Sequence, residues 1–549
     1  MLDSYHDIVP GTVHLVDVDH DIQGRHLDGD QDIVLVPKPS SDPEDPLNWS
    51  KRRKGLAIGM VYCYTIGLGI SSAVQYSVLT QITEATGITN SQLNLGTGLQ
   101  FLFLGWGNLI WQPIALTYGR RGVYVLSAFL CVFPIIWSAY STSAGEWYAH
   151  RIIFGFVGGP IESLPEISVP DLFFAHERGT YMGIYVFLLF GCNFVAPLCA
   201  GWIDLASDWQ WVMYFGALVQ AASCIIMYFF LEETIYFRNT VEGVDDEDSA
   251  ELSVAPETGD MLPQKKEVDD EAKVVEESTT ISPGTTSSQT SYWQKLALFR
   301  SVLGRPSIKQ MFKMMYRPLL MMYHFPSITW AGLISVYGTC LSWYNVLNAT
   351  TSSLLSASPY FFSSGLVGTA YTAPLIGAAF AGLWSGWATD KFAIRLARRN
   401  NGIREPEHRL WALSLSGLLC AGGLILWGVG AANDLSWVGL VFGLGMLAFS
   451  VIAGGSITLS YAVDCFKEIS GETMMSVVVI RNTTGFAISY AINPWIDAMG
   501  VQNCFITAAM IALGCTATFL PMIYYGKSLR KASATKYWEY VRTAAATHA

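Results

Sequence analysis

Apolar residues along this chain gather into a series of long segments that are separated by polar connections. Each segment is close to the roughly 20 residues that a helix needs to cross a membrane. The segments are apolar throughout and do not alternate with a period of two, which favours helices over the strands of a membrane barrel. The segments lie at residues 55–77, 93–116, 122–141, 146–169, 180–203, 210–231, 319–346, 365–388, 411–431, 436–462, 474–498 and 501–525. This pattern predicts an all-α membrane protein with twelve transmembrane helices in two pseudo-symmetric six-helix bundles.

Positive charge is distributed unevenly between the two sides of these segments. Of the 33 Lys and Arg residues, all but Arg151 and Arg481 lie in the even-numbered connections or at the two ends of the chain. Lys and Arg remain on the cytoplasmic side during insertion, so both termini and the central loop are predicted to be cytoplasmic. Only 14% of all residues are charged, against roughly a quarter in soluble domains, as a lipid-facing surface requires.

A long polar stretch divides the chain into two similar halves. Residues 241–277 are strongly acidic and account for the net charge of −11, so we expect a disordered linker there. We predict a cytoplasmic tail over 1–54, six-helix bundles over 55–231 and 319–525, a cytoplasmic, largely disordered acidic loop over 232–318 and a cytoplasmic tail over 526–549. Paired six-helix bundles are typical of secondary transporters, whose substrate site lies between the halves near the middle of the membrane.

Motifs for covalent chemistry are missing from the sequence. There is no complete phosphate-binding loop, no HExxH or GxSxG motif and no Cys or His spacing that suits a metal ion. Gly526-Lys527-Ser528 resembles the end of a phosphate-binding loop, but Pro521 stands where its first Gly belongs. We therefore expect neither an enzyme nor a bound metal or cofactor, and the proton gradient as the energy source.

Two short motifs lie at equivalent places in the halves. Gly119-Arg120-Arg121 follows the second segment, and Gly386-x-x-x-Asp390-Lys391 follows the eighth. They resemble the two copies of the cytoplasmic signature of the major facilitator superfamily, which implies that these six residues form cytoplasmic gates. The first copy has Leu116 and Thr117 where that family usually has Asp and a base.

Further motifs narrow this resemblance. The fourth segment contains His150-Arg151-x-x-x-Gly155, which is similar to the Arg-bearing motif of the same family. The fifth contains Ala196-Pro197-x-x-Ala200-Gly201, which resembles the signature of proton-coupled antiporters but has Ala at two Gly positions. The entry Asp45-Pro46-Leu47-Asn48-Trp49-Ser50 and the exit Leu231-Glu232-Glu233-Thr234 resemble a fungal branch of the twelve-span drug:proton antiporter family that includes polyamine-type carriers.

Ionisable residues inside the apolar segments are candidates for proton coupling. A charge at the membrane centre costs roughly 2.5 to 3.5 kcal/mol, so it needs a partner or a function. Glu162 and Glu166 are four residues apart and share a helix face, where they disfavour simultaneous ionisation. Glu166 has the alternative of lying at the cytoplasmic interface, and Arg151 that of reaching the lipid headgroups. Arg151 and Glu162 lie about 16 Å apart along a helix, so each needs a partner on another helix.

Other polar residues complete the list of candidates. His324 is a further candidate for proton coupling, with packing as its alternative role. The predicted substrate cavity is lined by Gln75, Tyr76, Gln100, Asn193, Asn345, Arg481 and Asn482. The sequon Asn348-Ala349-Thr350 lies on the predicted outer face, so Asn348 is a candidate for glycosylation unless its closeness to the seventh segment blocks the transferase.

The leading functional prediction is a proton-coupled antiporter that exports a small organic compound, such as a drug or secondary metabolite, from a fungal cell. We expect a monomer in the cell membrane, with the vacuolar membrane as the alternative. Its expected partners are protons, the substrate and membrane lipid, and no nucleic acid. A plasma-membrane importer of polyamines or related organic cations is the second hypothesis. A nutrient sensor that signals through the acidic loop is the third, and the lack of a predicted folded cytoplasmic domain argues against it.

Overall fold

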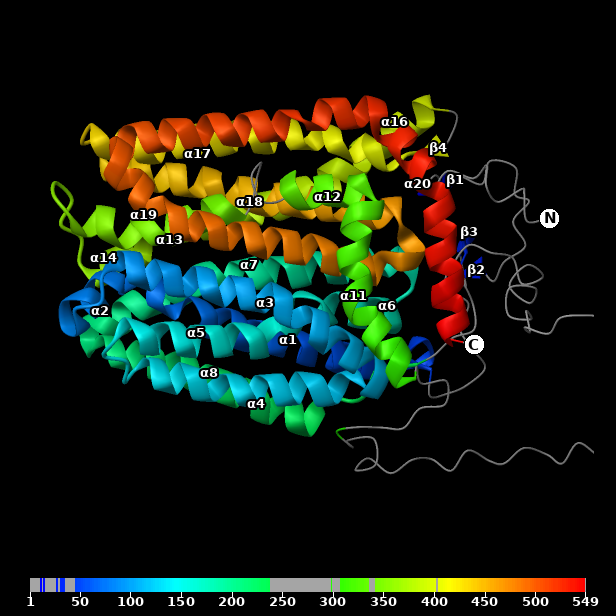
Figure 1. Ribbon diagram of the computed structural model, residues 1–549, viewed down its shortest axis with the longest axis horizontal. Coiled ribbons are helices and arrows are strands. Elements are labelled where there is room, and N and C mark those ends of the chain that lie inside the picture. The colour runs from blue at the N-terminus through cyan, green and yellow to red at the C-terminus, as the bar shows by residue number, and fades with distance from the viewer. Residues whose placement is uncertain are drawn as a thin grey trace, which may run out of the picture.

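The computed structural model describes residues 10–11, 13–14, 26–27, 30–34, 45–236, 298, 307–334, 341–400 and 403–548. Within this part nearly all residues are helical, and the long helices run side by side in two bundles (Figure 1). The all-α membrane fold expected from the sequence is therefore confirmed. The predicted acidic linker, 241–277, lies outside the described residues, as does most of the loop predicted over 232–318.

The first half contains eight α-helices, most of them long. They are α1 (Lys51–Ala73), α2 (Leu79–Thr86), α3 (Asn90–Tyr118), α4 (Arg120–Ser138), α5 (Ala144–Gly158), α6 (Leu164–Leu172), α7 (Ala175–Ala206) and α8 (Trp209–Phe230). The fourth predicted span is divided between α5 and α6 by the 3-10 turn Gly159–Glu162 (η4). Pro160 in this turn and Pro165 in the first turn of α6 have no amide hydrogen to donate, so a continuous helix is not favoured there.

The second half is less regular. Its helices are α11 (Ile308–His324), α12 (Pro326–Leu333), α13 (Leu341–Ser356), α14 (Ser364–Ala370), α15 (Thr372–Leu383), α16 (Thr389–Arg399), α17 (Leu413–Ala432), α18 (Trp437–Cys465), α19 (Ser470–Ala517) and α20 (Phe519–His548). The seventh span, predicted from residue 319, is interrupted because α11 ends at His324 and Pro326 starts a new helix. Helix α19 contains two spans, which meet at Gly500 with φ of 74°.

Nine segments in the described part of the chain are long and apolar enough to cross a membrane. Three features explain why this number is smaller than the twelve expected. The segment Ser470–Arg542 combines the last two spans. Helix α3 carries buried Gln and Asn residues that lower its mean hydropathy, and α12 and α13 are each short.

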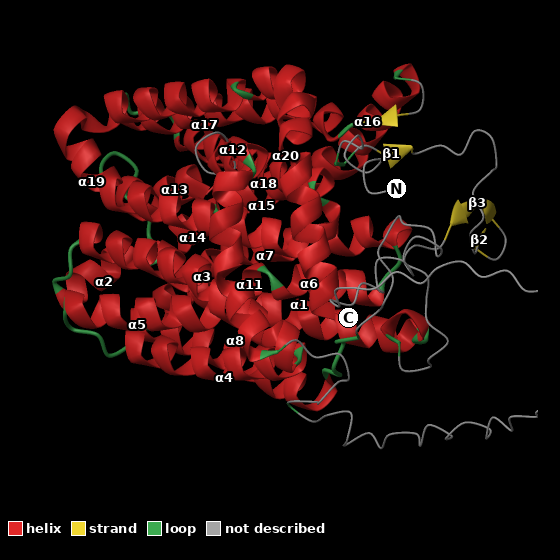
Figure 2. Cartoon of the chain, turned by 45° about the vertical axis from the view of Figure 1, so that its right-hand side comes forward, coloured by secondary structure: helices red, strands yellow, loops and turns green. Residues whose placement is uncertain are grey.

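Short strands lie at the end of the molecule where the two chain termini are found (Figure 2). They are β1 (Val13–His14), β2 (His26–Leu27), β3 (Asp30–Val34) and β4 (Ile403–Arg404). Strand β1 pairs antiparallel with β4, and β2 with β3. The sequence did not predict these strands, which are too brief to leave an alternating pattern.

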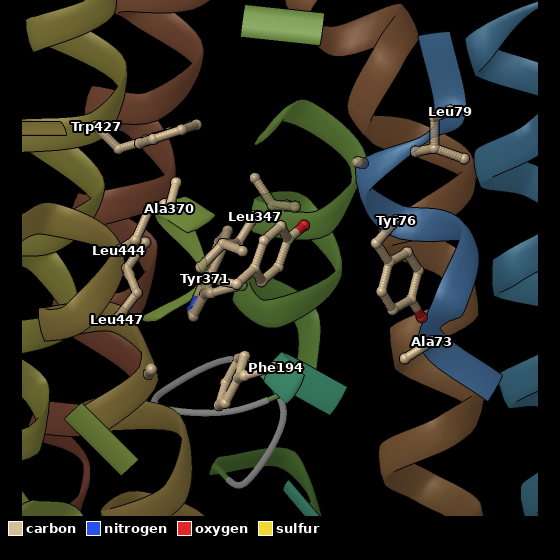
Figure 3. Packing of buried hydrophobic residues seen from close by; sticks show 14 of the residues in the cluster. Ala73, Tyr76, Leu79, Phe194, Leu347, Ala370, Tyr371, Trp427, Leu444 and Leu447 are labelled. Carbon is tan, nitrogen blue, oxygen red and sulfur yellow. The ribbon is translucent and has the colours of Figure 1, made fainter. Parts of the chain in front are cut away.

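The largest apolar cluster joins the two halves. It includes Tyr76 and Leu79 from the first half, and Leu347 and Tyr371 from the second, all almost fully buried. Figure 3 shows part of this cluster, with the side chains of the two halves across from each other. Close van der Waals packing of these side chains holds the halves together at the end away from the termini.

Glycines allow α3 and α19 to approach closely along the boundary between the halves. A Cβ atom added at Gly98 would lie 2.8 Å from the side chain of Ser489, and one added at Gly105 would lie 2.7 Å from that of Asn482. Because these glycines are seven residues apart, they lie on one stripe of α3. Nearer the end of the molecule where the termini lie, Gln112 donates from Nε2 to the Gly471 carbonyl at 3.3 Å. The two halves are therefore in contact at both ends of their boundary.

Candidate transport site

The turn η4 places a carboxylate beside the boundary between the halves. Gly159 fits against the backbone of α3, since an added Cβ would lie 3.1 Å from the Asn108 nitrogen. Ser163 donates from its hydroxyl to Oδ1 of Asn108 at 2.5 Å. These contacts hold the turn against α3 and direct the side chain of Glu162 towards α19. Glu162 is only 7% exposed.

Two residues of the second half bind Glu162. Arg481 forms an ion pair with Oε1 of Glu162, and Asn482 donates from Nδ2 to Oε2 at 2.6 Å. All three side chains are largely buried. The carboxylate is thus compensated by a cation and an amide that belong to the opposite half, and each buried charge depends on the other.

Glu166 lies one helical turn beyond Glu162, in α6. It is close enough to Glu162 and Arg481 to interact electrostatically with both. Its Oε2 atom is buried and has no hydrogen-bond partner among the described residues. Tyr185 of α7 closes this side of the site and donates from its hydroxyl to the Ile161 carbonyl at 2.8 Å. One arginine therefore faces two carboxylates.

Arg151 occupies a separate polar site inside the first half. Its Nη1 donates to Oε1 of Gln100 at 3.0 Å, and its guanidinium lies 4.6 Å from the centroid of the Trp147 ring. Tyr76 is near enough to interact with it electrostatically. Arg151 is only 4% exposed, so it does not extend to the lipid headgroups.

The remaining cavity candidates divide into two groups. Asn345 donates to the Gly485 carbonyl of α19 at 3.4 Å, one turn from Arg481. Gln75 and Asn193 instead donate to carbonyls of their own helical segments, Ser72 at 3.1 Å and Leu189 at 2.6 Å. The structure thus places Asn345 against α19 one turn from Arg481, whereas the hydrogen bonds of Gln75 and Asn193 stay within their own segments.

His324 and Asn348 lie where the sequence did not place them. The Nδ1 atom of His324 is 3.0 Å from the hydroxyl of Tyr540 in α20, at the end of α11 and away from Glu162. Asn348 is within α13, only 2% exposed, and its Oδ1 accepts from the Tyr371 hydroxyl at 3.2 Å. A glycan at Asn348 stays a prediction, and this buried conformation does not favour it.

The first gate motif is bound by a glutamate that sequence reasoning did not select. Gly119 has φ of 112° and ψ of 151°, a conformation that is essentially restricted to glycine. The amides of Arg120 and Arg121 each donate to the carboxylate of Glu233 at 3.0 Å. A Cβ atom at Gly119 would lie 2.6 Å from Oε2 of Glu233. A signal for this contact was available, since an acidic residue just after one span complements the N-terminus of a neighbouring helix.

The arginines of this motif join three spans. Arg120 forms an ion pair with Asp171, at the end of α6. Arg121 donates from Nε to the Leu231 carbonyl at 2.6 Å and from Nη2 to the Tyr228 carbonyl at 2.7 Å. The ends of α4, α6 and α8 are therefore held together without the family's usual Asp.

In the second half, a buried ion pair joins α20 to the 3-10 turn Pro406–Ala412 before α17. Gly386 lies in the π-helical turn Trp384–Ala388 and Lys391 is exposed, while the side chain of Asp390 lies outside the described part. Arg530 of α20 donates from Nε and Nη2 to Glu407 at 2.9 and 2.7 Å, and both residues are almost fully buried. No local pattern indicates this pair, because both residues lie in polar segments that are typical of solvent-exposed connections.

Two bundles of long, apolar helices, with a buried ion pair between them, define a polytopic membrane carrier. Residues 61–489 match the family model described as Major Facilitator Superfamily. The chain belongs to this family, and it is a secondary transporter rather than an enzyme.

Relatives and solved structures agree with this assignment. An uncharacterized MFS-type transporter of Schizosaccharomyces pombe is 28% identical, with 98% of this chain and 95% of the relative covered. Protein HOL1 of Saccharomyces cerevisiae is 27% identical, with 91% and 90% covered. MFS transporter cpaT of Aspergillus oryzae is 24% identical, with 92% and 95% covered. The xylose transporter XylE of E. coli, in a partially occluded inward-open conformation, has a similar fold, with a TM-score of 0.54, 12% identity and coverage of 85% and 99%.

Proposed function

We propose that this transporter is a proton-coupled antiporter that exports a small organic compound, such as a drug or secondary metabolite, across the cell membrane as a monomer. The observation that carries the proposal is the ion pair between Glu162 and Arg481, which joins the two halves inside the membrane. Glu166 supplies a second carboxylate within electrostatic range of the same arginine. Similarity to MFS transporters of filamentous fungi, such as cpaT of Aspergillus oryzae, supports the assignment.

Protonation of Glu162 gives a direct route from the proton gradient to movement of the halves. The ionised carboxylate accepts hydrogen bonds from Arg481 and Asn482 and favours the closed boundary. A proton on Glu162 removes its charge, so the attraction between the halves weakens and their equilibrium shifts towards an open state. Glu166 then offers Arg481 a second carboxylate, which avoids an uncompensated buried cation.

Substitution of Glu162 tests this proposal. Glu162→Gln keeps the shape but cannot exchange a proton, so efflux of a fluorescent drug from cells should be lost at equal levels of folded protein. The double variant Glu162→Gln/Arg481→Gln separates coupling from folding, because it should recover stability without recovering efflux. Glu146→Gln, at the start of α5, is the matched control and should transport normally. Unchanged transport with an intact pH dependence in Glu162→Gln would remove this residue from the mechanism.

Import of polyamines or related organic cations is the alternative, and one observation favours it. The buried Oε2 of Glu166 accepts no hydrogen bond among the described residues, which suits it to bind an ammonium group. Uptake of labelled spermidine by cells with and without the gene tests this function. Gene-dependent uptake that is lost in Glu166→Gln would establish import, whereas absent uptake together with drug efflux would leave export.

A further inference from the structure

Helix α11 contacts both halves of the transporter. It runs across the long helices near the end where the termini lie (Figure 1). Its Met322 packs against a small apolar cluster that consists of Leu109 from α3 and of Met475 and Val479 from α19. Ser476 of α19 also donates from its hydroxyl to the Pro318 carbonyl at 2.8 Å. Helix α11 therefore covers the boundary between the halves.

The contacts of α11 fix its depth and orientation. Leu109 precedes the end of α3 at Tyr118 by nine residues, or about 14 Å along the helix, which is roughly the thickness of one leaflet. One edge of α11 faces α20, which follows the last span: Arg317 donates to the Tyr540 carbonyl at 3.1 Å, and His324 contacts the Tyr540 hydroxyl. Arg317 also pairs with Glu472 of α19 at 3.2 Å. That edge is directed towards the cytoplasm, and α11 lies at the level of the inner leaflet.

The opposite face of α11 is apolar and exposed. Its side chains follow one another at intervals of one to four residues and occupy one side of the helix. They are Ile308, Phe312, Tyr316, Leu319, Leu320 and Tyr323, with exposed fractions from 36% to 86%. Lys309 and Lys313, four residues apart and both exposed, lie between this face and the edge that carries Arg317. No acidic residue occurs in α11.

We propose that this exposed face binds anionic phospholipid of the cytoplasmic leaflet and that the bound lipid strengthens closure of the transporter at its cytoplasmic end. The apolar side chains lie among the acyl chains, and Lys309 and Lys313 extend along the edge to bind the phosphate headgroups. Lipid binds α11 best when the helix lies on both α3 and α19, so it stabilises the closed boundary by mass action.

Lipid titration of the purified full chain tests the inference. In neutral detergent micelles, dioleoylphosphatidylserine should raise the melting temperature in a saturable way, and phosphatidylcholine at the same mole fraction should not. Each lysine near an anionic lipid surface raises the affinity for the lipid about fivefold. The variant Lys309→Gln/Lys313→Gln should therefore need about 25-fold more phosphatidylserine to reach half of the maximal rise in melting temperature. The control Lys531→Gln/Lys536→Gln removes two exposed lysines of α20 and should respond as the natural protein does.

Two further measurements distinguish binding of the whole lipid from binding of its headgroup alone, and show which helices the lipid stabilises. Soluble glycerophosphoserine should not stabilise the protein, because it lacks the acyl chains that the apolar face requires. Phosphatidylserine should slow hydrogen exchange in α11 and in residues 470–480 of α19. An equal response of the Lys309→Gln/Lys313→Gln variant and the natural protein would overturn the proposal, as would equal stabilisation by phosphatidylcholine or by the soluble headgroup.

Discussion

Glu162 and Arg481 are 319 residues apart in the chain and form an ion pair across the boundary of the two halves. The local sequence around each residue favours this contact. The prolines around η4 break the fourth span and expose Glu162 to α19, and Gly105 of α3 lets the neighbouring Asn482 approach. The ion pair therefore forms only when the two halves are in contact at this level of the membrane.

A double-mutant cycle should detect this coupling. Arg481→Gln alone leaves the buried carboxylate of Glu162 without its cation and should lower the free energy of unfolding by about 3–5 kcal/mol. Glu162→Gln alone should cost less, because Glu166 still faces Arg481. The double variant removes both charges and should lose less than the sum of the two single losses. Thermal unfolding of the purified variants measures all three losses. Strictly additive losses would show that the two side chains do not interact.

Two adjacent glutamates should differ sharply in their contribution to stability. Glu233 accepts hydrogen bonds from the amides of Arg120 and Arg121 while buried, whereas Glu232 forms an ion pair with Arg53 in which the side chains keep 14% and 24% exposure. Glu233→Ala should cost about 3 kcal/mol, because charge-assisted hydrogen bonds contribute about 1.5–3 kcal/mol each. Glu232→Ala should cost about 1 kcal/mol or less. Thermal unfolding compares the two variants, and equal losses would contradict the role given to Glu233.

Sequence patterns predicted the spans well because a helix in lipid must be long and apolar. Pro160 and Pro165 account for the break in the fourth span, since proline interrupts the helical hydrogen bonds. Sequence patterns did not predict that α11 crosses the bundle. A helix whose exposed face meets lipid is apolar whether it spans the membrane or lies along it, so the apolar residues after 319 were read as part of the seventh span.

The sequence indicated the residues of the candidate site, but it did not indicate which of them contact one another. Glu162, Glu166, Arg481 and Asn482 stand out because polar residues are rare in apolar segments. Which of them meet depends on how the two halves pack, and no local pattern encodes that contact. Glu233 and Glu407 were missed for the opposite reason: acidic residues in polar connections look solvated, although the structure buries both.

Glycine at position 105 should be required for the contact between the halves. A Cβ atom there would lie 2.7 Å from that of Asn482, so Gly105→Ala should displace Asn482 from Glu162, reduce transport and lower stability by about 1–3 kcal/mol. Gly59→Ala in α1 is the matched control: its Cβ meets nothing within 4 Å, and helix propensity predicts a gain of up to about 1 kcal/mol. Melting temperature and drug efflux measure both effects. Similar behaviour of the two alanine variants would mean that α3 and α19 are not in close contact at this level of the membrane.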